Sequence, residues 1–325
     1  MHRLLRPFAA LVLLVAAAPA ALAQAWPTAR PIRIIVSASP GTLTDSIGRY
    51  YADHLAKAFG QQVIVDNKPG AANLLAMQAA KAAPPDGYTL LLGTAASFAT
   101  NPHLMKALPY DPLKDFVPVA LLSRPGFAIV VNSKMPVKTL PELVAYAKSR
   151  PDGLAVAVDG PRNFTGLSAA YLSKATGAPL RLIPYKNIAQ GAQDVAAGTA
   201  DMVIQGYGLV QGMVTKGDLR PVAVTSPIRL PLLPDVPAVA ETYSGFDITG
   251  WLAFFAPAGT PEEILVRVNA ELDKAIKLPE TRVWGDRLYQ SVEPQAGTLA
   301  QLREFVRSQH DMWGTMVSQI GVQPE

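Results

Sequence analysis

The sequence predicts an α/β protein of two lobes with a ligand cleft between them. Short runs of β-branched residues alternate with helical stripes of apolar residues, which indicates parallel βαβ units with right-handed crossovers. Two such sets are present, and extended stretches at about residues 123–128 and 246–256 carry the chain to the second set and back. Double crossings of this kind form a hinge, and a cleft between two lobes is a preferred ligand site.

The first set opens with a strand, a small-residue loop and a helix. Ile32–Val36 is a β-branched run bounded by prolines, so it predicts a buried strand. Thr42 or Thr44 can cap the helix that follows, and Asp45 lies in its first turn, where the helix dipole favours negative charge. Four apolar residues spaced four apart form the buried stripe of this helix: Ile47, Tyr51, Leu55 and Phe59. The unpaired N–H groups at its start suit an anion, although an ordinary β–α turn explains the same residues.

The remaining elements are predicted in chain order from the same patterns. In the first set and the crossing, strands are expected at 62–66, 88–92, 117–122 and 127–131, and helices at 73–82 and 139–150. In the second set, strands are expected at 154–158, 181–184, 202–204 and 220–225, and helices at 167–176 and 191–197. An apolar return stretch at 248–256 precedes helices at 261–276 and 298–320, and Gly314 is a candidate break in the last one.

Composition and the N-terminus indicate an exported protein. Residues 1–23 have a basic start, an apolar stretch too short to span a bilayer comfortably, and an Ala-Leu-Ala cleavage site, so we expect a signal peptide; a membrane anchor is the alternative. The chain has no cysteine, which excludes disulfides and a lipoprotein anchor. Its net charge of +4 is not gathered into a basic cluster, so no nucleic-acid partner is expected.

The sequence lacks the motifs of the common catalytic and metal sites. Four histidines are present, without an HExxH motif or a paired His–carboxylate spacing, and no G-x-S-x-G elbow or P-loop lysine occurs. We therefore expect no catalytic residue, no metal and no cofactor. Arg162, in a small polar loop, can clamp a carboxylate bidentately, although a solvated surface arginine is the alternative.

Several segments of the chain carry a family resemblance, among them DNKPGA followed by PDGYTLL, and LPYDPLKDFVPV. Nearly the whole chain after the signal segment resembles the Bug proteins, the solute-binding receptors of tripartite tricarboxylate transporters. The resemblance implies a type II periplasmic-binding-protein fold, a periplasmic location, a small organic acid as ligand and membrane permease subunits as partners; we expect a monomer. With the crossings, it predicts a first lobe of residues 24–125 and 248–325 and a second lobe of residues 126–247.

The resemblance also implies which loops hold the ligand. They are residues 40–45, 94–98 and 159–165 and the strand exits at 185 and 205–207, which are the loops that strand-end reasoning also selects. The predicted ligand-binding residues are Ser39, Pro40, Gly41, Thr42, Thr44, Asp45, Thr94, Ser97, Phe98, Arg162, Asn163, Phe164, Thr165, Tyr185, Gln205 and Tyr207. A carboxylate is expected at the N–H groups of residues 41–44, with the hydroxyl of Thr42, Ser97 or Thr165; a salt bridge from Arg162 is the rival.

This sequence departs from the family's pattern inside the predicted pocket, which leaves the ligand open. Thr42 stands where a second glycine is usual, Asn163 and Gly166 replace a Gly-Ser step and a histidine, and Gln205 replaces a frequent acid. An aliphatic acid and an aromatic acid both remain candidates. Four aromatic residues can flank an aromatic acid or serve as ordinary packing: Phe98, Phe164, Tyr185 and Tyr207.

Three functions are compatible with the predicted cleft. The first is a receptor that delivers a carboxylate to a transporter, and the second is a sensor that delivers it to a signalling partner. The third is an exported enzyme, which the lack of an identifiable catalytic base disfavours.

Overall fold

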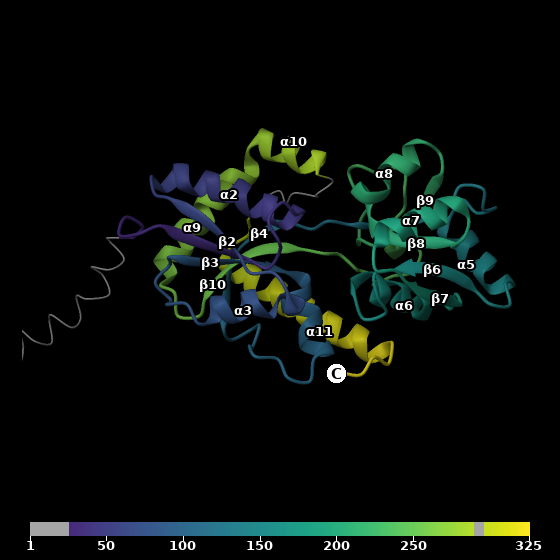
Figure 1. The fold of residues 1–325 in the computed structure, drawn as a ribbon, viewed down its shortest axis with the longest axis horizontal. Helices are drawn as coiled ribbons and strands as arrows, with labels where there is room; N and C mark the ends of the chain where they lie inside the picture. The colour runs from purple at the N-terminus through teal and green to yellow at the C-terminus, as the bar shows by residue number, and fades with distance from the viewer. Residues whose placement is uncertain (1–25, 289–295) are drawn as a thin grey trace, which may run out of the picture.

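The computed structural model describes residues 26–288 and 296–325. The predicted signal peptide, residues 1–23, therefore lies outside the described residues. The described chain forms two α/β bodies that lie side by side along the long axis and are joined by extended segments (Figure 1). Each body is built on one five-stranded sheet, with strand orders β2-β1-β3-β10-β4 and β7-β6-β8-β5-β9. We call the bodies the first and second lobe.

The first lobe combines the beginning of the chain with its last part. Its strands are β1 (Ile32–Val36), β2 (Val63–Asn67), β3 (Thr89–Thr94), β4 (Phe116–Ser123) and β10 (Leu252–Pro257). Its helices are α2 (Leu43–Phe59), α3 (Leu74–Lys81), α4 (Asn101–Leu104), α9 (Glu262–Lys277), α10 (Pro279–Arg287) and α11 (Leu299–Gln319). Strand β1 pairs in parallel with β2 and β3, whereas β10 runs antiparallel between β3 and β4.

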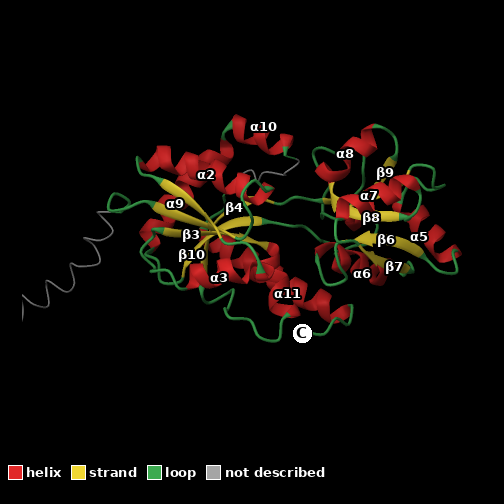
Figure 2. Ribbon diagram, viewed as in Figure 1, coloured by secondary structure: helices red, strands yellow, loops and turns green. Residues whose placement is uncertain are grey.

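The second lobe repeats this arrangement with a continuous piece of chain. Its strands are β5 (Phe127–Asn132), β6 (Leu154–Val158), β7 (Leu180–Pro184), β8 (Met202–Gly206) and β9 (Leu219–Val224). Its helices are α5 (Leu140–Ser149), α6 (Phe164–Thr176), α7 (Ile188–Ala197) and α8 (Tyr207–Thr215). Strand β6 is parallel to β7 and β8, and β5 is antiparallel to β8 and β9. Helices cover both faces of each sheet (Figure 2), so the predicted two-lobed α/β fold is confirmed.

The crossing strands take the same place in both sheets. Strand β10, on the return path, and β5, on the outward path, are each fourth in their sheet's order and antiparallel to both neighbours. The parallel strands β1 and β3 of the first lobe and β6 and β8 of the second have their carboxyl ends near these crossings. This places the strand-exit loops of the two lobes opposite each other.

Local sequence explains the first strand–loop–helix unit. Strand β1 has the predicted bounds, and its residues are almost fully buried. Thr42 caps α2, and Gly60 ends it in the left-handed conformation that glycine tolerates best. Of the predicted stripe, Ile47, Tyr51 and Leu55 are buried, while Phe59 is partly buried against the same core.

The structure differs from the expected elements in the glycine-rich and proline-rich parts. Helices α8 and α10 were not predicted, and α6 begins at Phe164, three residues before the expected start at 167. Helix α11 is continuous through Gly314, whose role is spatial: a Cβ there would come 2.7 Å from Cε1 of His103. After β3 the chain forms a π-helical turn at Ala96–Thr100 instead of a loop. Among residues 26–288 and 296–325, no helix is long and apolar enough to cross a bilayer.

The two lobes also touch through α11, whose C-terminal part reaches toward α6 (Figure 1). The ring of Trp313 on α11 lies 5.6 Å from the ring of Phe164 at the start of α6, measured between centroids. Buried residues of both sheets belong to one hydrophobic cluster that runs through this contact. The lobes are therefore packed together on one side and open on the other.

Candidate functional site

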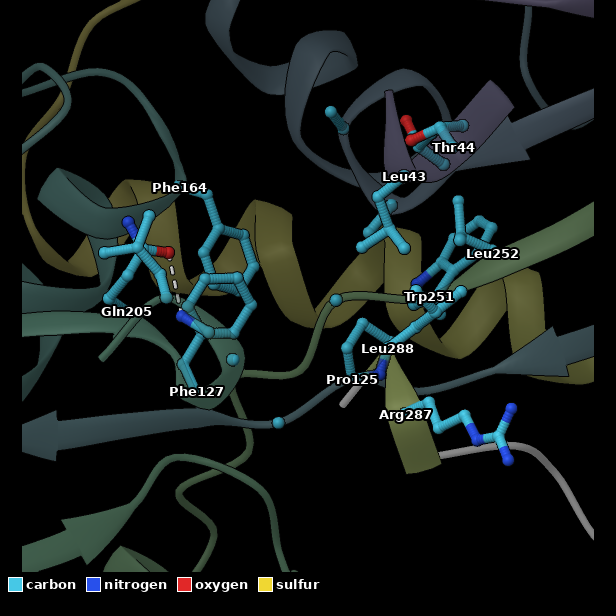
Figure 3. Close-up of a pocket in the computed structure, with 18 residues that line it drawn as sticks. Leu43, Thr44, Pro125, Phe127, Phe164, Gln205, Trp251, Leu252, Arg287 and Leu288 are labelled. Carbon is cyan, nitrogen blue, oxygen red and sulfur yellow. Dashed lines mark hydrogen bonds between the residues drawn. The ribbon is translucent and has the colours of Figure 1, made fainter. Parts of the chain in front are cut away.

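A cavity of about 550 Å³ lies between the lobes at the carboxyl ends of β1, β3 and β8 (Figure 3). Both crossings contribute to it as well. Its lining residues among those described are Leu43, Thr44, Thr94, Ala95, Ala96, Pro125, Gly126, Phe127, Phe164, Gln205, Gly206, Gly208, Leu209, Gly250, Trp251, Leu252, Arg287 and Leu288. Ligand sites of two-lobed proteins typically have such a position and size.

The first-lobe wall of the cavity contains the N-terminus of α2. The residues before it use their own polar groups: the Gly41 N–H donates to Oδ2 of Asp45 at 2.8 Å, and the Thr42 hydroxyl donates to the Ser39 carbonyl at 2.8 Å. Leu43 and Thr44 are the first two residues of the helix, where backbone N–H groups have no acceptor within the helix. Both residues line the cavity.

Asp45 stabilises this loop from behind and does not line the cavity. It is 2% exposed, and its carboxylate accepts hydrogen bonds from Arg49 at 3.0 Å and from Asn67 at 2.9 Å, as well as from Gly41. Burial acts to raise the pKa of Asp45, but the bonds from Arg49, Asn67 and Gly41 outweigh it and hold the pKa below its usual value. The carboxylate is thus kept ionised, and its charge is compensated within the loop.

The exit of β3 contributes a second hydroxyl to the same wall. Thr94 lines the cavity, and its Oγ1 lies 3.3 Å from both the hydroxyl and the backbone nitrogen of Ser97. Ser97 itself is 1% exposed. Thr94 therefore presents the polar group of this loop to the cavity, while Ser97 holds it from behind.

The second-lobe wall is largely apolar. Phe127 at the start of β5 and Phe164 at the start of α6 lie with their ring centroids 4.3 Å apart (Figure 3). Leu209, in the first turn of α8, is 41% exposed and completes this surface. Gln205 is the polar side chain here, and its Oε1 accepts a hydrogen bond from the Gly206 N–H at 2.8 Å.

Trp251 lies between the two walls on the return crossing. It is 1% exposed, and its indole N–H has no acceptor in the part of the chain that the structure describes. Its ring packs against Phe98, Phe255 and Phe305 in the first-lobe core. Trp251 is thus a lining residue that strand-end reasoning does not select.

Arg162 does not line the cavity. Its guanidinium donates to the backbone carbonyls of Leu104 and Gln323, both at 2.9 Å, and lies 3.2 Å from the Glu325 carboxylate. It thereby ties the second lobe to the first. The one charged side chain among the described lining residues is Arg287, and Figure 3 shows its guanidinium pointing away from the Phe127–Phe164 pair.

The structure brings only part of the predicted ligand-binding set to this cavity. Thr44, Thr94, Phe164 and Gln205 line it. The others lie outside its lining: Ser39, Pro40, Gly41, Thr42, Asp45, Ser97, Phe98, Arg162, Asn163, Thr165, Tyr185 and Tyr207.

Several of these outlying residues have structural contacts of their own. Phe98 is fully buried and stacked on Phe255 with 3.7 Å between ring centroids. Thr165 is bonded to Asp159, and the Tyr185 hydroxyl donates to Asp194 at 2.8 Å. Their role in ligand binding stays a prediction.

Sequence reasoning missed the lining residues that come from the crossings and from the unpredicted helices. Phe127 and Trp251 lie within the stretches predicted to cross between the lobes, and a cleft flanked by crossings must be partly lined by them. Leu209 and Arg287 lie on α8 and α10, which the sequence pattern did not predict. Among the residues described, no group of three or more metal-ligating side chains occurs.

Comparisons with known proteins agree with this architecture. A family model described as "Tripartite tricarboxylate transporter family receptor" matches residues 47–322. A UPF0065 protein of Bordetella bronchiseptica is 37% identical over 263 residues, which cover 81% of this chain and 78% of the relative.

Two solved structures have the same fold. Rpa4515 of R. palustris, solved with adipate, is 29% identical with a TM-score of 0.76, over 92% of this chain and 100% of that one. The periplasmic binding protein BugD is 29% identical with a TM-score of 0.72, over 91% of this chain and 99% of the other.

Proposed function

The chain belongs to the family of tripartite tricarboxylate transporter receptors, and we propose that it captures a small organic carboxylate in the periplasm for the membrane permease of such a transporter. The family consists of binding proteins and not of enzymes. The periplasmic location is supported by the similarity to BugD and by the signal-peptide pattern of residues 1–23. The carboxylate class is supported by the adipate bound to Rpa4515.

One observation carries the proposal for the site. Residues with uncharged donors line the first-lobe wall of a cavity whose described lining contains no acidic side chain: Leu43 and Thr44 in the first turn of α2, and Thr94 after β3. A helix N-terminus adds partial positive charge at this point. Several neutral donors that converge in a dry cleft suffice to hold an anion without a salt bridge.

The proposed contacts refine the expected ones. We propose that the carboxylate lies at Thr44 and Thr94, because these two line the cavity whereas Thr42, Ser97 and Thr165 do not. Arg162 is proposed to join the lobes rather than to hold the ligand. The lobe boundaries at residues 125/126 and 247/248 and a monomeric state are part of the proposal, and closure of the cleft on ligand is expected to occur about the two crossings.

The test is calorimetric titration of the purified protein with a panel of mono- and dicarboxylates, followed by two variants with the best ligand. Thr44→Val should weaken binding by roughly two- to tenfold, because one hydrogen bond to an anion is lost without a change in shape. Thr315→Val, on an exposed face of α11, is the matched control and should leave the affinity unchanged.

Two outcomes would contradict the proposal. If no acid of the panel binds, the receptor function is wrong. If an acid binds and Thr44→Val behaves like the control, the anion lies elsewhere. Delivery to a signalling partner instead of a permease predicts the same binding, and capture of the permease subunits by the ligand-bound protein separates the two roles.

A further inference from the structure

The two walls of the cavity differ in chemistry. The first-lobe side presents the hydroxyl-bearing residues Thr44 and Thr94 beside Leu43, at the N-terminus of α2. The opposite wall presents Phe127, Phe164 and Leu209 (Figure 3). Such a site is polar at one end and apolar at the other.

From this asymmetry we infer that the cleft takes a monocarboxylate with a bulky apolar body, such as an aromatic ring or a chain of about six carbons, in preference to a dicarboxylate. The inference rests on the proposed function and specifies its ligand. The carboxylate lies against the first-lobe wall, and the body lies against the rings of Phe127 and Phe164. Apolar surface that both partners bury contributes to binding roughly in proportion to its area.

The opposite wall has few groups that could bind a second carboxylate. Arg287 turns its guanidinium away from the two phenyl rings (Figure 3), and the carboxamide oxygen of Gln205 is already engaged by Gly206. The other donors at this wall are the Gln205 amide NH2 and the backbone N–H groups at the starts of α6 and α8, beside the apolar side chains of Phe164 and Leu209. No described side chain of this wall carries a positive charge or a hydroxyl, and a desolvated anion without such partners binds weakly.

Matched pairs of acids test the inference directly. Hexanoate and adipate have the same carbon chain, and benzoate and terephthalate have the same ring, so each pair differs by one carboxylate. We expect the monocarboxylate of at least one pair to bind about tenfold or more tightly than its partner, and neither dicarboxylate to bind more tightly. If neither monocarboxylate reaches that margin, or if either dicarboxylate binds more tightly than its partner, the inference is overturned and the proposed function stays intact. If none of the four acids binds, the inference is overturned, and the wider panel of acids decides the proposed function separately.

A variant sharpens the same test. Leu209→Arg places a cation at the apolar wall, and because Leu209 is 41% exposed the variant should fold. It should raise the affinity for the dicarboxylate relative to the monocarboxylate by about tenfold. Leu232→Arg, at a site that is 38% exposed and outside the cavity lining, is the control and should leave the ratio unchanged. An unchanged ratio in Leu209→Arg, or an equal change in both variants, shows that this wall does not face the ligand.

Discussion

The loops after β1 and β6 have the same position in the two sheets, yet they differ in the contacts that they make. Each follows the second strand in its sheet's order, contains a glycine with positive φ, and leads into a helix. Asp159 lies in the second loop, whereas Asp45 lies in the first turn of the helix after the first loop. The first loop presents Leu43 and Thr44 to the cavity. The second contributes only Phe164 to the described lining.

The second loop is closed by its own side chains. The backbone N–H of Asp159 donates to Oγ1 of Thr165 at 2.9 Å, and the Asn163 amide donates to the Asp159 carbonyl at 2.9 Å. These side-chain polar groups are thus used inside the loop. The helix after it begins without a side-chain cap at Asn163, whereas Thr42 caps α2 by accepting a hydrogen bond from the Asp45 N–H.

An arginine of α2 and an arginine of the second loop point in different directions. Arg49 of α2 donates to Asp45 of the same helix at 3.0 Å. Arg162 of the second loop reaches across to the first lobe and donates to the carbonyls of Leu104 and Gln323. The second loop therefore makes contact between the lobes, whereas the arginine next to the first loop bonds within its own lobe.

The largest change in the free energy of unfolding is expected from substituting two glycines: Gly166, at the start of α6, and Gly41, in the first loop. A Cβ at Gly166 would lie 2.1 Å from the Gly160 carbonyl oxygen, so Gly166→Ala should lower the free energy of unfolding by about 3 kcal/mol. Gly41 has φ of +80° and open space around it, and Gly41→Ala should cost about 1–2 kcal/mol through backbone strain alone. Urea denaturation of both variants measures the difference, and equal losses would contradict the tighter packing of the second loop.

A smaller change in the free energy of unfolding is expected from removing the charge of Asp45, which hydrogen-bonds to the first loop. Asp45→Asn should lower the free energy of unfolding at pH 7 by about 2 kcal/mol, because buried charge-assisted bonds are lost. The folded-state pKa of Asp45 lies below its unfolded value, so its contribution is full above about pH 4 and is lost as the pH falls through the folded pKa. Urea denaturation at several pH values should show the wild type and the variant converging in acid. A gap that stays constant down to about pH 2 would contradict this role.

The smallest effect is expected from the arginine that joins the lobes. Arg162→Ala should lower the free energy of unfolding by about 1 kcal/mol, since its side chain is partly exposed and its bonds are few. Ligand affinity should stay within about threefold, because the arginine does not line the cavity. Calorimetry of the variant checks this. Abolished binding would place the anion on the second lobe instead of at the first-lobe wall.

The fold was largely predictable because strong local patterns agree with the final packing. β1 and β6 have the predicted bounds: β6 is a continuous apolar run, and β1 is a β-branched run interrupted only by Arg33, and each lies between two other strands of its sheet. α8 was missed because glycines at 208 and 212 oppose helix formation, and α10 because Pro279 follows α9 almost at once.

The site was predictable at the level of loops but not of side chains. Strand-end reasoning selected Thr44, Thr94 and Gln205, which line the cavity. It could not show that the π-helical turn after β3 directs Phe98 into the core, against Phe255. Nor could it show that Trp251 faces the cavity, since that depends on the register of β10 and its crossing.

The position of β10 has a consequence for the order in which the chain folds. Leu252 is the partner of both Thr94 in β3 and Ser123 in β4, so β4 can join its sheet only after residues 252–257 are available. Every strand of the second sheet comes from residues 127–224, which have much shorter contacts along the chain. Sheets with local contacts form faster, and domains generally fold as units. During refolding, amide protons of β5–β9 should therefore gain protection from exchange before those of β4. The partner strand of β4 lies more than a hundred residues further along the chain.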